Sequence, residues 1–109
     1  MSGFKVETEQ APGELRLRLF GDLDLAASDE VDEVLAGAQL NGKLDVVMDL
    51  RSLAFIDSSG VRVLLRAQAR AELFGGRLHL IRGCDRVHRV FELAGIDTRF
   101  HFVDEDQSS

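Results

Sequence analysis

The clearest pattern along the chain is an alternation of apolar and charged residues near its start. Residues 15–19 alternate leucine with arginine, and this period of two is typical of a strand with one buried face. Residues 4–9 alternate in the same way, with a charge at every second position, and predict an edge strand. Pro12 and Gly13 favour a turn between the two segments, because proline presets one turn dihedral and glycine accepts the next. We therefore expect a hairpin.

A helix is predicted next, after residues 21–24 (Gly-Asp-Leu-Asp) interrupt the alternation. Ser28 is its predicted N-cap, and the two acidic residues that follow suit the first turn of a helix. The apolar positions then take helical spacing. They are Val31, Val34, Leu35 and Ala38. Residues 41–42 (Asn-Gly) predict the end of this helix.

The middle of the chain is more apolar. Residues 44–50 have a β-branched centre and predict an interior strand that is covered on both faces. A second apolar group, residues 53–56, leads into residues 57–60 (Asp-Ser-Ser-Gly). A long amphipathic helix follows and ends at Gly75 and Gly76. Its apolar face comprises Val63, Leu64, Ala67, Ala71 and Phe74.

The last third of the chain predicts two strands with a short helix between them. Residues 78–81 and 100–103 have strand patterns, and Asp85 is the predicted cap of the intervening helix. Strands and helices that alternate after a hairpin imply parallel pairing, so we expect an α/β fold in which helices pack on a mixed sheet. The sequence predicts one domain over residues 1–103 and an acidic tail over residues 104–109.

Composition narrows the possible function classes. The chain of 109 residues has the length of one domain and needs no disulfide or metal to stabilise its core. Its single cysteine, Cys84, cannot form an internal disulfide, and the first residues lack a secretory signal pattern. No apolar run approaches the roughly 18 residues of a membrane span, so we expect a cytoplasmic protein without a membrane partner. The net charge of −6 disfavours nucleic-acid binding.

The segment 57–60 is the strongest candidate for a functional site. It lies between a strand and a helix, where sites collect in open α/β sheets. A hydroxyl at this position should be exposed, and the free N–H groups of the helix N-terminus could hold an added phosphate. The simplest interpretation is that these residues only cap the helix, because Asp, Ser and Gly are common before helices.

Other polar residues suggest little further chemistry. His79 stands between two leucines and is expected on the sheet surface, and the other histidines lie on separate predicted elements. No spacing of His, Cys and acidic residues suits a metal, so we expect neither a metal nor a cofactor. Arg62, Arg66 and Arg70 follow each other at intervals of four. Such a row is usually a solvated helix face, and the alternative is a docking ridge for an acidic partner.

Taken together, the order of elements and four segments resemble an anti-sigma factor antagonist, a stand-alone STAS domain. The matching segments are Phe20-Gly21-Asp22-Leu23-Asp24, Val47-Met48-Asp49-Leu50, Phe55-Ile56-Asp57-Ser58-Ser59-Gly60-Val61 and Val90-Phe91-Glu92-Leu93-Ala94-Gly95-Ile96. They span nearly the whole predicted domain. Members of this bacterial family commonly carry a further helix after the last strand, whereas residues 104–109 show no apolar periodicity. The C-terminal helix could therefore be absent here.

The resemblance implies a switch rather than an enzyme. It implies that Ser58 is phosphorylated by an anti-sigma factor, an ATP-dependent serine kinase, and that a separate phosphatase removes the phosphate. The unphosphorylated protein would bind the kinase and free the sigma factor. The residues that would shape the partner-binding surface are Asp22, Asp24, Asp57, Ser59 and Gly60. A phosphate adds about −1.5 to −2 charges beside these acids, and like charges in a desolvated interface weaken binding.

Three alternatives remain from the sequence. Some STAS domains serve in transporters or lipid-trafficking complexes without a phosphorylation switch. A receiver-type domain would use Asp57 as phosphoacceptor, but it would want a lysine at the end of a late strand, and Lys5 and Lys43 are the only lysines. A hydrolase would use Ser58 or Ser59 as nucleophile, and it would need an oriented base beside it.

Overall fold

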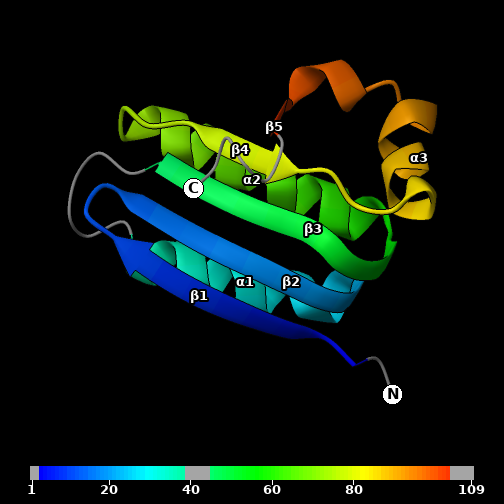
Figure 1. Cartoon of the computed structure of the whole chain (residues 1–109), viewed down its shortest axis with the longest axis horizontal. Helices are drawn as coiled ribbons and strands as arrows, with labels where there is room; N and C mark the ends of the chain where they lie inside the picture. Colours follow the sequence, from blue (N-terminus) through cyan, green and yellow to red (C-terminus); the bar gives the residue numbers. More distant parts are fainter. Residues whose placement is uncertain (1–2, 39–44, 104–109) are drawn as a thin grey trace.

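The computed structural model describes residues 3–38 and 45–103, which form a five-stranded sheet with helices packed against it (Figure 1). The elements in chain order are β1 Lys5–Ala11, β2 Glu14–Leu23, α1 Leu25–Ala38, β3 Asp45–Ile56, α2 Ser58–Leu73, β4 Leu78–Ile81, α3 Asp85–Leu93, the 3-10 helix η2 Asp97–Arg99, and β5 His101–Val103. The strand order is β1-β2-β3-β4-β5. β1 pairs antiparallel with β2, and the other pairs are parallel. The predicted hairpin and mixed sheet are therefore confirmed.

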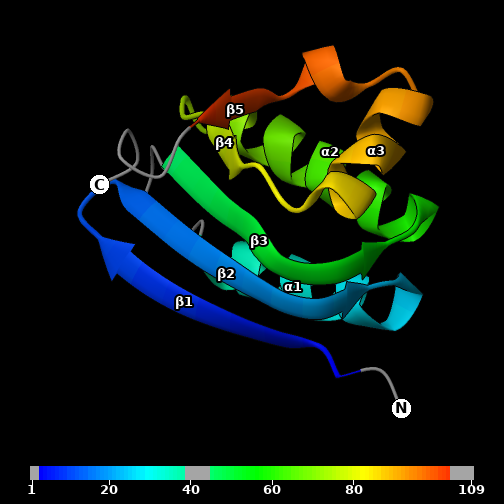
Figure 2. The same ribbon diagram turned by 45° about the vertical axis from the view of Figure 1, so that its right-hand side comes forward.

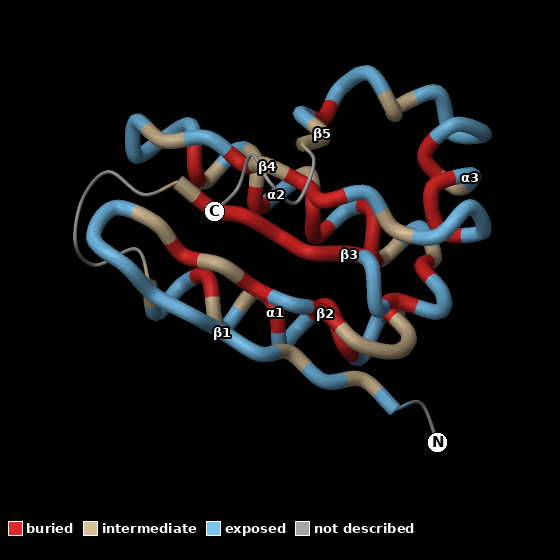
Figure 3. Tube along the Cα trace, in the orientation of Figure 1, coloured by how far each residue is buried: buried red, intermediate tan, exposed pale blue. Residues whose placement is uncertain are grey.

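The hydrophobic core lies between the sheet and the helices. Figure 2 shows α1 and α2 behind the same face of the sheet. The leucines of β2 belong to one buried cluster with apolar residues of these helices. The core side chains on the strands include Leu15, Leu17, Leu19, Met48 and Leu50, and those on the helices include Val31, Leu35, Val63, Leu64 and Phe91. β3 is the central strand and is buried along much of its length (Figure 3). Its burial confirms the interior strand predicted from residues 44–50, of which residue 44 lies outside the described residues.

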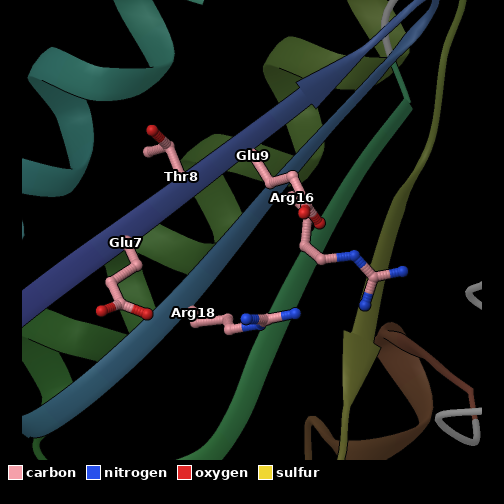
Figure 4. Close-up of a pocket in the computed structure, with 5 residues that line it drawn as sticks. All are labelled: Glu7, Thr8, Glu9, Arg16 and Arg18. Carbon is pink, nitrogen blue, oxygen red and sulfur yellow. The ribbon is translucent and has the colours of Figure 1, made fainter.

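The opposite face of the sheet carries rows of charged side chains. Strand register places Glu7 beside Arg18 and Arg18 beside Asp49. A shallow hollow of about 390 Å³ lies over β1 and β2, and Figure 4 shows its two arginines and two glutamates on one side of the strands with Thr8 on the other. The charged lining residues lie opposite each other in the register of β1 and β2, and none belongs to segment 57–60, so the hollow is not the candidate site.

Three details of the predicted elements were wrong. β2 does not end at residue 20 but continues through residues 21–23. Gly21 takes a φ of +90°, and the pairing with β3 shifts its register there and then goes on. α1 begins at Leu25, so Ser28 lies inside the helix and is not its cap. Asp85 is the first helical residue of α3 and makes no cap, since the N-cap position belongs to Cys84 without a side-chain hydrogen bond.

Other expectations have mixed outcomes. The single strand expected between the first two helices is longer than residues 44–50, because β3 runs on through the second apolar group, residues 53–56. The predicted end of α1 at residues 41–42 and the acidic tail at residues 104–109 lie outside the described residues. Within residues 3–38 and 45–103, no helix has the length and apolar character needed to cross a membrane.

Candidate functional site

Two parallel strands end side by side at the candidate site. Leu23 of β2 pairs in register with Ile56 of β3, and a helix starts within two residues of each. The N–H of Asp57 donates to the carbonyl oxygen of Leu23 at 3.3 Å. The first turns of α1 and α2 are also linked directly, because the hydroxyl of Ser28 donates to the carbonyl oxygen of Ser59 at 3.2 Å. Residues 57–60, called the Asp57–Gly60 turn below, are thus held between two strands and two helices.

Asp57 is the N-cap of α2. Its backbone is extended, and its Oδ1 accepts hydrogen bonds from the N–H groups of Ser59 at 2.9 Å and Gly60 at 3.0 Å. These bonds satisfy two of the donors that a helix N-terminus leaves free. Capping therefore accounts for Asp57 without a phosphoacceptor role.

Gly60 is buried where α2 approaches β2. A side chain at this position would have its Cβ 2.7 Å from Cγ1 of Ile56 and closer still to the carbonyl oxygen of Leu23. The oxygen belongs to the backbone, so it cannot rotate away as a flexible side chain would. Glycine is therefore required for the close contact between the start of α2 and the end of β2.

The two serines of the turn differ in accessibility. Ser58 is the first residue of α2 and is exposed, whereas Ser59 is half-buried and its carbonyl is engaged by Ser28. In the part of the chain that the structure describes, the hydroxyl of Ser58 has no hydrogen-bond partner. Ser58 is thus the more accessible of the two hydroxyls for another protein.

The acidic residues predicted for the site lie on the same edge of the sheet. Asp24 follows β2, and its Oδ1 accepts a hydrogen bond from the N–H of Ala27 at 3.0 Å, which makes Asp24 the cap of α1 in place of Ser28. Asp22 is half-buried near the end of β2, in register with Phe55. All six residues predicted for the site therefore belong to the adjoining ends of β2, β3 and α2.

Sequence reasoning missed three contributors to this edge. Ser28 is only 2% exposed, and its hydroxyl also donates to the carbonyl of Asp24 at 2.8 Å, so it joins the two helix starts. Leu25 and Phe55 are apolar yet 69% and 46% exposed. The position of Ser28 four residues after Asp24 could have suggested its role, but no local pattern marks the exposure of Leu25 or Phe55.

The histidines pack elsewhere. His79 contacts His101 with ring centroids 5.0 Å apart, and His88 contacts Phe102 at 4.9 Å. They belong to β4, α3 and β5, so none of these packed rings is a partner of the Ser58 hydroxyl. The described residues contain no group of three potential metal ligands. The site is an exposed serine at the end of β3, on the edge of the sheet that also carries the acidic residues and the exposed Leu25 and Phe55.

These features define a small α/β domain that presents one accessible serine where its sheet passes into a helix. A family model described as "Mlab, STAS domain" matches residues 6–104, and the chain belongs to the STAS domain family. An anti-sigma F factor antagonist from Lysinibacillus sphaericus is 29% identical over 93 residues, which are 84% of this chain and 80% of the relative.

Two solved structures show the same architecture over almost the whole chain. The anti-sigma factor antagonist SpoIIAA in its unphosphorylated form superposes with a TM-score of 0.79 at 26% identity, over 97% of this chain and 92% of that chain. The Bacillus cell fate determinant SpoIIAA in its phosphorylated form gives a TM-score of 0.72 at 25% identity, over 97% and 96%. The expected STAS-like fold is confirmed.

Proposed function

We propose that this protein is an anti-sigma factor antagonist that binds an anti-sigma factor serine kinase and releases it when Ser58 is phosphorylated. The proposal depends on one observation, the accessibility of Ser58. Its neighbour Ser59 is half-buried, and the carbonyl of Ser59 accepts a hydrogen bond from Ser28. Relatives named anti-sigma factor antagonists support it, as does the similarity to SpoIIAA, which has been solved in unphosphorylated and phosphorylated forms.

The proposed modification is an ordinary phosphoryl transfer. Oγ of Ser58 attacks the γ-phosphorus of ATP, and the bond from that phosphorus to the oxygen bridging to ADP breaks. The hydroxyl proton passes to a base on the kinase. The products are phosphoserine and ADP, and a separate phosphatase returns the serine by hydrolysis. The chain itself supplies only the acceptor, in keeping with a non-enzymatic regulator.

The surface around Ser58 explains why a phosphate would end binding. Leu25 and Phe55 offer apolar contacts, and Asp22, Asp24 and Asp57 favour a partner with basic groups around an apolar centre. A phosphate on Ser58 adds about −1.5 to −2 charges, and against the apolar centre of such an interface it would be desolvated without a counter-charge from the partner, which costs several kcal/mol. A loss of about 2.7–4 kcal/mol weakens binding by roughly 10²–10³. Local charge is therefore sufficient, and no refolding is required.

The test is phosphorylation of the purified protein by the serine kinase encoded in the same genome, with radiolabelled ATP. We expect one phosphate per chain, no labelling of Ser58→Ala, and normal labelling of the matched control Ser59→Ala. Equal labelling of Ser58→Ala and wild type would disprove the assignment of the acceptor. Stable binding to another partner without any labelling would instead favour a STAS module of a transporter or lipid-trafficking complex.

A further inference from the structure

Arg62 lies one helical turn after Ser58 on α2. Residues four apart on a helix are neighbours, with Cβ atoms about 5–6 Å from each other. Both side chains are exposed. Arg66, one turn farther along, is 2.9 Å from the carboxylate of Asp32, whereas Arg62 has no acidic partner among the residues that the structure describes. Arg62 is thus the nearest arginine to Ser58 along the helix, and it is unpaired.

The backbone at the start of α2 has little to offer a phosphate. The carboxylate of Asp57 occupies the N–H groups of Ser59 and Gly60, and the N–H of Val61 donates to the carbonyl of Asp57 at 3.0 Å. The N–H groups that were expected to hold a phosphate are therefore engaged already. The N–H of Ser58 itself is uncharged and cannot balance a dianion. A phosphate on Ser58, placed beside the carboxylate of Asp57, needs a cation.

We propose that Arg62 is the intramolecular counter-ion of phosphate on Ser58. Its planar guanidinium can donate two parallel hydrogen bonds to phosphate oxygens. The spacing of one helical turn between Ser58 and Arg62 brings the two groups within reach of each other. The proposal rests on the function proposed above and extends its regulation. Phosphorylation would add negative charge to the docking surface and, in the same step, occupy an exposed cation on it. The net charge of the surface still changes only by that of the phosphate, and Arg62 is no longer free to pair with an acidic group of the partner.

The pair can be tested without any kinase. Phosphoserine is installed at position 58 during translation, and the second pKa of the phosphate is measured by phosphorus NMR in the full chain. Arg62→Gln is expected to raise that pKa by about 0.3, the size typical of an i, i+4 ion pair. Arg66→Gln is the matched control, because it removes the same charge one turn farther away and should change the pKa much less. Thermal melts verify that each variant is folded.

A second NMR measurement observes the side chain of Arg62 directly. The side-chain Nε–H resonance of Arg62 should shift between the unphosphorylated and phosphorylated proteins, and the shift should decrease as salt is added. Identical phosphate titrations for Arg62→Gln and Arg66→Gln, with an unmoved Arg62 resonance, would overturn the proposed pair. That result would leave the proposed function standing. If the cognate kinase did not label Ser58, the proposed function would be wrong. The ion pair between phosphoserine 58 and Arg62 could still form, but it would have no regulatory role.

Discussion

Each residue of the Asp57–Gly60 turn meets a different environment, although the residues are adjacent in the chain. Successive side chains at the start of a helix point about 100° apart, so neighbours face different directions. Asp57 turns back onto the helix N–H groups, Ser58 faces solvent, and Gly60 closes against β2. The accessibility of Ser58 therefore depends on the conformation of its neighbours as much as on its own identity.

Gly60→Ala is expected to destabilise the protein by about 1–3 kcal/mol, because its methyl group would press on the Leu23 carbonyl and on Ile56. Urea unfolding followed by circular dichroism measures the effect. Gly37→Ala is the control, since Gly37 lies in α1 with nothing within 4 Å of an added Cβ. That variant should be neutral or more stable by up to about 1 kcal/mol. Equal stability of the two variants would contradict the close approach at Gly60.

At the scale of elements, the ends of β2 and β3 shape the proposed docking surface. Their parallel pairing places the starts of α1 and α2 next to each other, and the Ser28 hydroxyl connects them. Leu25 at the start of α1 and Phe55 near the end of β3 are consequently displayed on the edge that carries Ser58. Exposed apolar side chains beside the proposed phosphorylation site are typical anchors of a protein interface.

Leu25→Gln and Phe55→Gln are each expected to weaken binding to the kinase that labels Ser58 by about tenfold, because each removes an apolar anchor. Isothermal titration calorimetry with that kinase gives the affinity. Leu73→Gln is the matched control, since Leu73 is 78% exposed at the opposite end of α2. Unchanged affinity for both variants would show that the partner does not contact these anchors, even if phosphorylation of Ser58 still ended binding.

At the scale of the whole molecule, the sheet face opposite α1 and α2 presents ionisable groups that link stability to pH. Burial would raise the pKa of Asp49. The guanidinium of Arg51 outweighs this effect and holds the pKa below its usual range, because it donates hydrogen bonds of 2.7 and 2.9 Å to the two carboxylate oxygens of Asp49. Burial, and then the neighbouring His101, lower the pKa of His79. Asp45 and Glu14 offset this only in part.

The lowered pKa of His79 predicts a loss of stability in mild acid. In the unfolded chain, His79 has its ordinary pKa of 6.5, and in the folded chain its pKa is lower. As the pH falls, the unfolded chain therefore binds a proton first, and the free energy of unfolding should decrease below about pH 7. His79→Gln should lose less stability than wild type between pH 7.5 and 5.5. Denaturant unfolding at each pH measures both proteins, and parallel pH profiles would contradict the prediction.

Local pattern was sufficient for most of the fold. The alternation in β2, the turn at Pro12 and Gly13, and the amphipathic face of α2 each depend on residues that are close in sequence, so each could be predicted. The position of Asp57 before a helix was visible in the same way. One error occurred where a distant segment decides, at Gly21, whose strand continues because β3 pairs with it through a shifted register. The errors at Ser28 and Asp85 concern the exact start of a helix, because several neighbouring polar residues could each have been the cap.

By itself, the sequence determined the order of strands and helices and the presence of a serine between a strand and a helix, because period and turn chemistry are local properties. Only the tertiary structure decided that Ser58 is more exposed than Ser59, and that Leu25 and Phe55 lie exposed on the same edge. Each of these features depends on β2 and β3 meeting side by side. The pairing joins residues more than thirty positions apart, and no local pattern records it.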